Sequence, residues 1–188
     1  MKKNIVVLIS GRGTNLKSII SATNNENFPA KISLVISSNK SALGLKIAEK
    51  NHIKNVVVEQ KEFSNKELFE ADLIGKIVKQ DPSLICLAGF MHILSKTFIN
   101  KFRNKIINIH PSLLPDYKGL NTHERAIHAG EKYSGCTVHY VTEVLDGGKI
   151  IAQEKVLISP SDTPETLSRK VLEREHIIYP KTIESLLS

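Results

Sequence analysis

An amide and an imidazole stand two residues apart at the end of an apolar run, in Asn108-Ile-His110, and proline follows them directly. If the run Ile106–His110 forms a strand, both polar side chains lie on one face. An amide can donate to a carbonyl oxygen that gains negative charge, and an imidazole can donate or move a proton near neutral pH. The pair therefore suits carbonyl-group transfer, although a turn-closing asparagine and a structural core histidine would give the same pattern.

A glycine-rich turn, Ser10-Gly-Arg-Gly-Thr-Asn-Leu16, follows the first apolar run and opens an amphipathic stretch. Glycines allow a sharp turn, and free N–H groups at a helix N-terminus bind anions. The third glycine of a dinucleotide fingerprint, the acidic residue after the second strand and the Walker lysine are all missing. The turn therefore favours one phosphate on a small ligand over NAD or ATP. The alternative is a turn in which Thr14 or Asn15 only caps the helix.

Asp146 stands in Leu-Asp-Gly-Gly, where it offers a carboxylate but also matches the commonest hairpin turn. No Gly-x-Ser-x-Gly nucleophile elbow occurs, and Cys86 lies in an apolar run typical of a buried strand. If acyl-type chemistry takes place, the attacking group therefore belongs to the substrate, and no covalent enzyme intermediate forms.

The segment from His123 to His128, HERAIH, is similar to the zinc motif HExxH but has one residue too many. On a helix this spacing turns the second histidine about 140° away from the first, whereas the zinc motif aligns them. We therefore expect no metal site, and surface or capping roles for these histidines. His139 shares a strand face with Thr137, and either faces the same cleft or fills the core.

The elements that must position these residues alternate along the chain. Strands are expected at Ile5–Ile9, Ile32–Ser37, Asn55–Glu59, Leu84–Ala88, Ile106–His110, Gly135–Val141 and Lys149–Leu157. Helices are expected at Asn15–Ala22, Ala42–Asn51, Lys66–Gln80, Ser95–Lys101, Thr122–Ala129, and from Ser161-Asp-Thr-Pro164 toward Leu187. This alternation predicts an α/β fold with a mainly parallel, twisted sheet. The last two strands form a hairpin-like pair joined through EVLDGG, with turn chemistry at Asp146-Gly-Gly148, and they make the sheet mixed near its C-terminal part.

The composition favours a single domain spanning residues 1–188, of which 41% are hydrophobic and 24% charged. No apolar run approaches the roughly 20 residues of a membrane helix. Two cysteines without CxxC spacing predict neither a disulfide framework nor a zinc knuckle, so we expect a soluble, cytoplasmic protein. The net charge of +7 is spread along the chain and aromatics are 5%, which favours small anionic ligands over nucleic acid.

Five segments together resemble a known family in order and approximate spacing: VVLISGRGTNL, LAGFMHILS, INIHPSLLPDYKGLNTH, GCTVHYVTEVLDGG and EREHIIYP. Through them the chain resembles, nearly end to end, the phosphoribosylglycinamide formyltransferase family. The resemblance implies a Rossmann-like three-layer formyltransferase fold. It implies direct formyl transfer from 10-formyltetrahydrofolate, a co-substrate, to the amine of glycinamide ribonucleotide in de novo purine biosynthesis, without a metal. We expect a monomer or homodimer with no nucleic-acid or membrane partner.

The resemblance also implies roles for single residues. Asn108 would polarise the formyl oxygen, His110 as imidazolium would support the same oxyanion, and Asp146 would orient His110 and help to move a proton through water. The ribonucleotide would be bound by Gly13, Thr14, Asn15 and Glu175, the last of which, without the resemblance, is typical of a solvated helix residue. The folate end would be bound by Lys66, Met91, His92, Ile93, Leu94 and Val141 together with Asn108 and Asp146, and supported by Thr137 and His139.

Two of these positions depart from the family pattern. His92 stands where relatives often carry arginine, and Lys66 stands where some do. Both keep a group that can be positively charged but lose the guanidinium fork, so we expect ligand affinity to differ.

Two relatives and two unrelated classes are alternatives. Methionyl-tRNA formyltransferase would need a further C-terminal domain, formyltetrahydrofolate deformylase usually has an N-terminal one, and we expect neither here. The SGRGTNL loop favours a phosphorylated acceptor over both. A non-catalytic nucleotide- or nucleic-acid-binding α/β domain would bind nucleic acid with steep salt dependence, and a dehydrogenase would bind NAD saturably.

Overall fold

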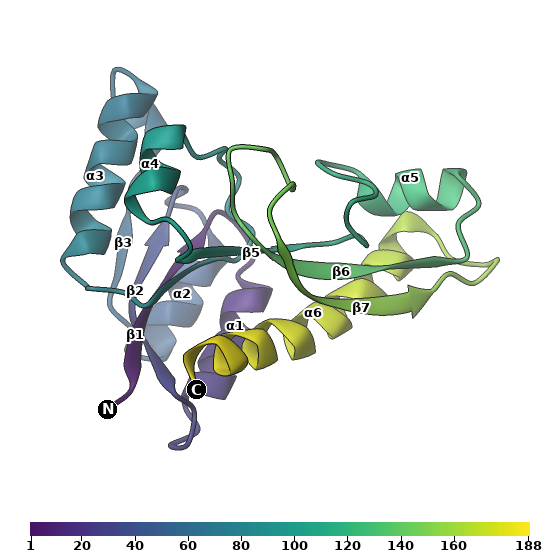
Figure 1. The fold of residues 1–188 in the computed structure, drawn as a ribbon, viewed down its shortest axis with the longest axis horizontal. Coiled ribbons are helices and arrows are strands. Elements are labelled where there is room, and N and C mark those ends of the chain that lie inside the picture. Colours follow the sequence, from purple (N-terminus) through teal and green to yellow (C-terminus); the bar gives the residue numbers. More distant parts are fainter.

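The computed structural model describes residues 1–188, and every expected strand and helix is present with slightly different ends. The strands are β1 (Lys3–Ile9), β2 (Ala30–Ser37), β3 (Asn55–Val57), β4 (Leu84–Leu87), β5 (Ile106–His110), β6 (Tyr133–Tyr140) and β7 (Ile150–Leu157). The helices are α1 (Thr14–Thr23), α2 (Leu43–Lys50), α3 (Lys66–Val78), α4 (Lys96–Lys101), α5 (Thr122–His128) and α6 (Pro164–Leu187), with a short 3-10 turn, η1 (Gln60–Glu62) (Figure 1).

One sheet holds all seven strands in the order β3-β2-β1-β4-β5-β6-β7. Pairing is parallel from β3 through β5 and antiparallel for β5 with β6 and β6 with β7. The predicted α/β fold, mainly parallel and mixed toward the C-terminal part, is thus confirmed. The strand order reverses between β1 and β4, and in open α/β sheets ligands bind in the crevice at this point.

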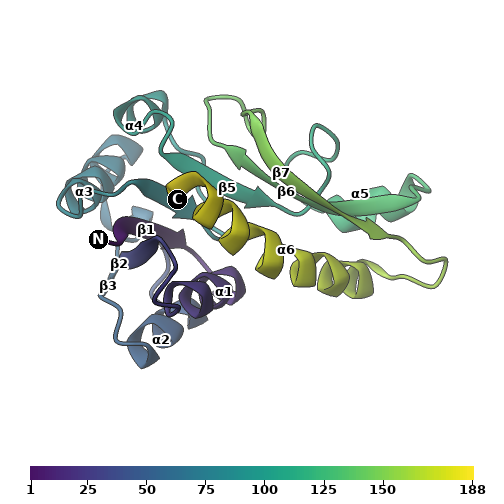
Figure 2. The same cartoon turned by 60° about the horizontal axis from the view of Figure 1, so that its bottom comes forward.

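The sheet is covered on both faces, which explains the nearly continuous apolar runs of its central strands. Ile5, Val7 and Ile9 pack in the core shared with α1, α2 and α6. Val6 and Leu8 point the other way, into the core shared with α3 and α4. Figure 2 shows the resulting three layers, with α1, α2 and α6 on one face and α3 and α4 on the other.

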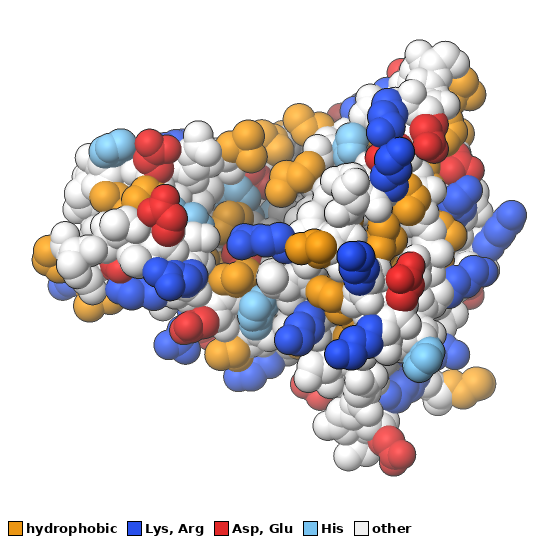
Figure 3. Space-filling model, turned by 180° about the vertical axis from the view of Figure 1, so that it is seen from behind, with side chains coloured by type: hydrophobic (Ala, Val, Ile, Leu, Met, Phe, Trp, Pro, Cys, Tyr) orange, Lys and Arg blue, Asp and Glu red, His pale blue; other side chains and the backbone are white.

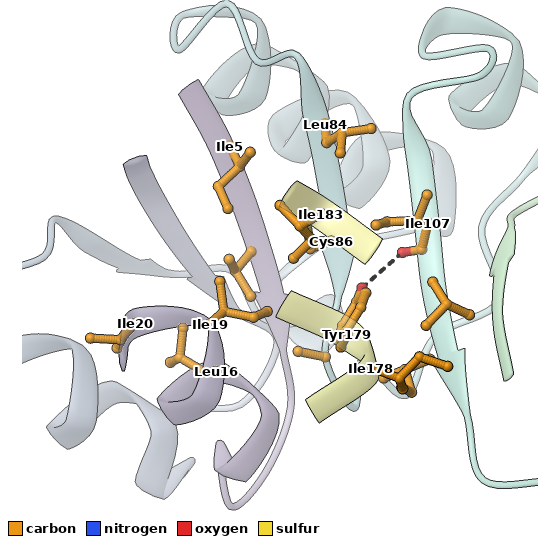
Figure 4. Packing of buried hydrophobic residues seen from close by; sticks show 14 of the residues in the cluster. Ile5, Leu16, Ile19, Ile20, Leu84, Cys86, Ile107, Ile178, Tyr179 and Ile183 are labelled. Atoms are coloured by element: carbon orange, nitrogen blue, oxygen red, sulfur yellow. Dashed lines mark hydrogen bonds between the residues drawn. The ribbon is translucent and has the colours of Figure 1, made fainter. Parts of the chain in front are cut away.

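Tyr179 of α6 is fully buried and fastens this helix to the middle of the sheet (Figure 4). Its hydroxyl lies 2.9 Å from the carbonyl oxygen of Leu87 and 3.2 Å from that of Ile107, so one proton is shared between neighbouring strands. Burial raises the pKa of Tyr179 well above its ordinary value, which keeps the hydroxyl protonated as a donor.

Replacing Tyr179 by phenylalanine removes only this hydroxyl, and we expect the free energy of unfolding to fall by about 1 kcal/mol, the net worth of a buried hydrogen bond. Urea denaturation measures the change. Tyr133→Phe is the matched control because the Tyr133 side chain is 43% exposed. Equal stabilities of the two variants would contradict the prediction.

Helix α6 begins as the sequence predicts. Pro164 lies in its first turn, and Thr163 and Thr166 form a reciprocal capping box in which each side chain accepts from the other residue's N–H. None of the helices, including this long one, combines the length and apolar character needed to cross a membrane.

The connection between β6 and β7 is close to the hairpin-like connection that the sequence predicts. The strands pair antiparallel as predicted, but β6 ends at Tyr140 and β7 begins at Ile150, so residues 141–149 form a longer loop. Its turn is closed by the N–H of Gly147, which donates to the carbonyl oxygen of Val144 at 3.0 Å. Asp146 lies inside this loop with φ 47, in the left-handed region. The turn over residues 144–147 thus contains Asp146 and Gly147, close to the turn chemistry expected at Asp146-Gly-Gly148.

Candidate active site

A cleft of about 1240 Å³ lies at the carboxyl ends of β1, β4 and β5. Its walls are Gly11–Asn15 after β1, Leu87–Leu94 after β4, the end of β5, the loop residues 119–123 and 141–146, and one face of α6. Small-molecule sites usually measure roughly 300–1,000 Å³, so this cleft has room for two ligands. Figure 3 shows the hollow, between the end that carries α5 and the end that carries α3 and α4, with apolar side chains along its rim.

Asn108 and His110 point together into the middle of this cleft. Their neighbours Ile107 and Ile109 pack on the opposite face, in the core with α6. The two-residue spacing therefore places both side chains on the same face of β5, as strand geometry predicts.

His110 is held between two acceptors. Its Nε2 lies 3.0 Å from the carbonyl oxygen of Tyr117, and its Nδ1 lies 3.4 Å from Oδ2 of Asp146. A neutral ring has one N–H and can satisfy only one of these partners, whereas the imidazolium donates to both. The His110 ring thus lies between a carbonyl oxygen and a carboxylate oxygen.

Asn108 is oriented by His139, its cross-strand partner on β6. Nδ1 of His139 donates to the carbonyl oxygen of Tyr140 at 2.9 Å, so Nε2 accepts from Nδ2 of Asn108 at 3.2 Å. Burial lowers the pKa of His139 and keeps its ring neutral, against the opposing effects of the Tyr140 carbonyl and the Asp146 carboxylate. One N–H of the Asn108 amide is thus used, and the second is left for a ligand.

Asp146 brings its carboxylate between the two imidazoles. Oδ2 accepts from the backbone N–H of Gly119 at 2.9 Å, and Oδ1 lies 3.7 Å from Nε2 of His139. The left-handed backbone at Asp146 directs the side chain to this place, and asparagine and aspartate tolerate that conformation better than most residues. The arrangement supplies a hydrogen-bond donor, an imidazole ring and a carboxylate around one point, as proton-coupled carbonyl chemistry requires.

The loop after β1 turns sharply at Gly13, which has φ 73. A Cβ there would lie 2.5 Å from Cα of Gly44, so only glycine fits. Gly13 is also the N-cap of α1, and no side chain caps the helix. The sequence alternative in which Thr14 or Asn15 serves as the cap is therefore wrong, and the first-turn N–H groups are left for an anion.

Asn15 and Glu175 form a buried pair at this end of the cleft. Nδ2 of Asn15 donates to Oε2 of Glu175 at 2.7 Å, whereas Oδ1 of Asn15 is buried without a partner. Burial raises the pKa of Glu175, against the opposing effects of the Asn15 hydrogen bond and the charge of Arg12. Glu175 is not a solvated helix residue. The buried Oδ1 of Asn15 requires a donor such as a ligand hydroxyl.

Replacing Glu175 by glutamine should stabilise the unliganded protein at pH 7. Because the folded-state pKa of Glu175 is raised, its ionised form is disfavoured in the fold: its contribution to stability is full below the ordinary value of 4.5 and is lost as pH rises through the raised pKa. We therefore expect Glu175→Gln to have a higher free energy of unfolding than the unsubstituted protein at pH 7, and the difference to vanish below pH 4.5. Urea denaturation at both pH values measures it.

Glu173→Gln, at an exposed position on the same helix, is the control for this experiment. A Glu175→Gln variant that is less stable than the unsubstituted protein at pH 7 would contradict the prediction.

The loop after β4 forms the opposite end of the cleft and is tied down at both sides. Ser10 donates its N–H to the carbonyl oxygen of Gly89 at 3.0 Å, and its hydroxyl accepts from the N–H of Met91 at 2.9 Å. The buried carboxylate of Glu70 accepts from the N–H of Ser95 at 2.8 Å and from the Ser95 hydroxyl. The wall between these ties includes the expected folate residues Met91, His92, Ile93 and Leu94, and Val141 faces the same cleft.

His92 and Lys66 lie at the edge of this end. The His92 ring is 5.2 Å from the ring of Phe69 and 5.3 Å from that of Phe90, measured between centroids. Burial, and then the charge of Lys66, lower the pKa of His92. Lys66 itself does not line the cleft, and its Nζ lies 3.8 Å from the carboxylate of Glu70.

Thr137 lies behind the cleft, as a supporting residue would. Its hydroxyl donates to the carbonyl oxygen of Ser112 at 2.7 Å and accepts from the N–H of Leu114 at 3.1 Å. These bonds fix the chain just after β5, next to His110.

His123 lines the cleft although surface or capping roles were expected for it. Its ring is half-buried, with Nδ1 buried and without a partner, and burial followed by the charge of His110 lowers its pKa. The spacing of the zinc motif does not indicate that His123 lines the cleft. The signal in the sequence was its closeness to His110, since α5 directly follows the segment that leaves β5. No group of three or more His, Cys, Asp or Glu side chains is placed to hold a metal ion.

Residues 3–183 match the family model described as formyl transferase. The phosphoribosylglycinamide formyltransferase of Haemophilus influenzae is 48% identical over 183 residues, covering 97% of this chain and 86% of that protein. The trifunctional purine biosynthetic protein adenosine-3 of Chironomus tentans is 42% identical over 189 residues, but the chain spans only 14% of its length. The crystal structure of phosphoribosylglycinamide formyltransferase from Brucella melitensis has a TM-score of 0.97 at 42% identity, covering 100% of this chain and 97% of that one.

Proposed function

Because the chain belongs to the formyl transferase family, we propose that it transfers the formyl group of 10-formyltetrahydrofolate to the amine of glycinamide ribonucleotide. The products are formylglycinamide ribonucleotide and tetrahydrofolate, and the reaction serves de novo purine biosynthesis in the cytoplasm. One observation carries the proposal. The Asn108 amide, the His110 ring and the Asp146 carboxylate meet in one cleft, between an anion-binding loop and an apolar wall.

In the proposed first step, the substrate amine attacks the formyl carbon, and the carbonyl electron pair moves onto oxygen. The free N–H of Asn108 donates to that oxyanion, and the positive charge of the His110 imidazolium stabilises it. No enzyme nucleophile is needed, which agrees with the buried positions of Cys86 and Cys136.

In the second step, the tetrahedral intermediate collapses and its bond to the folate nitrogen breaks. The amine has one proton to lose, and the leaving nitrogen needs one to gain. The Asp146 carboxylate, 3.4 Å from His110, is suited to accept the first proton and return it through water.

Substrate binding divides between the two ends of the cleft. The first-turn N–H groups of α1, at Gly13, Thr14 and Asn15, are proposed to bind the phosphate. The unpartnered Oδ1 of Asn15 and the neighbouring Glu175 carboxylate suit the ribose hydroxyls. The apolar wall of Leu87–Leu94 with Val141 suits the pterin ring. Lys66, paired with Glu70, is proposed to contribute positive charge to this end from outside the cleft. Residues 1–188 act as one domain in this proposal.

The experiment follows loss of 10-formyltetrahydrofolate by absorbance, with and without glycinamide ribonucleotide. Turnover that depends on the ribonucleotide supports the transferase. Turnover with the folate alone would indicate a deformylase instead, and no turnover under either condition would overturn the enzymatic proposal.

A further inference from the structure

The segment Tyr117–Leu120 touches both proposed proton-handling residues, and it does so with its main chain. The Tyr117 carbonyl accepts from His110, and the Gly119 N–H donates to Asp146. The path of this segment therefore sets the direction of the His110 ring and of the Asp146 carboxylate together.

The segment is not held by main-chain bonding of its own. No backbone-to-backbone hydrogen bond involves residues 117–120. Tyr117 has φ 53 and Asn121 has φ 56, in the left-handed region that tyrosine in particular rarely adopts, and Gly119 between them has φ 76. Such residues persist only where the surroundings impose them. Something outside the segment must supply that constraint.

Arg125 of α5 supplies it. Nη1 of Arg125 donates to the carbonyl oxygen of Lys118 at 2.7 Å and to that of Leu120 at 3.3 Å. The guanidinium carbon lies 5.4 Å from the centroid of the Tyr117 ring, within the range of a cation–π contact. On its other side, the Tyr117 hydroxyl donates to Glu131 at 2.9 Å. One side chain thus bonds two carbonyls through Nη1 and lays its planar guanidinium over a ring, and a lysine ammonium lacks that planar group.

We propose that Arg125 is a positioning residue for the reaction: it clamps Tyr117–Leu120 and so holds His110 and Asp146 in the geometry that formyl transfer needs. The inference rests on the proposed function of these two residues. Arg125 does not line the cleft, so it acts through the segment and not on a substrate. The stretch HERAIH, set aside as a failed zinc motif, therefore supplies a clamp at Arg125 and a cleft-lining ring at His123.

The test compares Arg125→Ala and Arg125→Lys with Arg103→Ala, a control that removes the same charge from an exposed site away from the cleft. Arg125 is exposed too, and we expect circular dichroism and thermal unfolding to show all variants folded. In Arg125→Ala, kcat should fall by about tenfold to a hundredfold, the effect of a small misplacement of catalytic groups, while both KM values change much less. Arg125→Lys should stay well below the unsubstituted rate.

A second readout does not depend on turnover. Nitrogen-15 NMR of the His110 ring should show a water-protected Nε2–H in the unsubstituted protein and in Arg103→Ala, and its loss in Arg125→Ala. Full activity of Arg125→Lys, or unchanged kcat and His110 signals in Arg125→Ala, would overturn the clamp. If the unsubstituted protein fails to turn over, the proposed function fails, and the His110 signals alone then support or overturn the role of Arg125.

Discussion

Alanine in place of Asn108 lowers kcat for formyl transfer by about 10²–10³-fold, the usual effect of removing one oxyanion donor. The amide has two N–H groups, and His139 takes only one of them. The other has no partner in the protein and gains its importance as charge develops on the formyl oxygen. Steady-state kinetics should therefore show a loss in kcat with little change in either KM.

Asn27→Ala is the control for the same change of residue type, since Asn27 is exposed in the loop between α1 and β2. The fold should survive at Asn108 because the side chain is half-buried and its neighbours Ile107 and Ile109 anchor the strand from the other face. A near-normal rate in a folded Asn108→Ala variant would remove Asn108 from the chemical step.

Asparagine in place of Asp146 should lower kcat by about 10²–10⁴-fold, the range expected when a general acid–base group is lost. Asparagine suits this test because it tolerates the left-handed φ of 47 that an alanine would strain. The amide oxygen can still accept from the N–H of Gly119. Its NH₂ group would then face His110, where it can neither pair with the imidazolium nor take up a proton.

Calorimetric titration with glycinamide ribonucleotide separates binding from chemistry in Asp146→Asn. We expect the affinity to stay close to that of the unsubstituted protein, because the proposed phosphate and ribose contacts lie at Gly13–Asn15 and Glu175. Asp81→Asn, at an exposed position remote from the cleft, is the control. A loss confined to binding would move Asp146 out of the proton-transfer role.

The sheet and the direction of Asn108 and His110 were predictable because strand alternation is a local property. The apolar run Ile106–His110 fixes its own strand, and two-residue spacing then fixes which side chains share a face. The same rule could not indicate that Asp146 would meet them. Its Asp-Gly-Gly sequence indicates only a local turn, whereas the contacts of Asp146 to Gly119 and His110 are long-range.

The sequence could not predict which glutamate of α6 is buried, for a related reason. Glu175 and Glu173 are both glutamates on one long helix, yet one is buried and the other exposed. Only the packing of α6 against α1 and the sheet distinguishes the two. The positions of His123 and Arg125 depend in the same way on how α5 meets the segment that leaves β5, which no periodicity in HERAIH encodes.

A single turn of α6 separates Glu175, in the cleft wall, from Tyr179, at the centre of the core. Residues four apart lie on the same side of a helix, so the carboxylate is fixed to the same support as the hydroxyl that joins β4 and β5. The end of the cleft proposed to bind the ribonucleotide is therefore rigid, and it has little freedom to rearrange around a different acceptor. Acceptor choice at that end is expected to follow from the rigidity of the interior, and an enzyme with altered choice would require repacking of the core beneath Glu175.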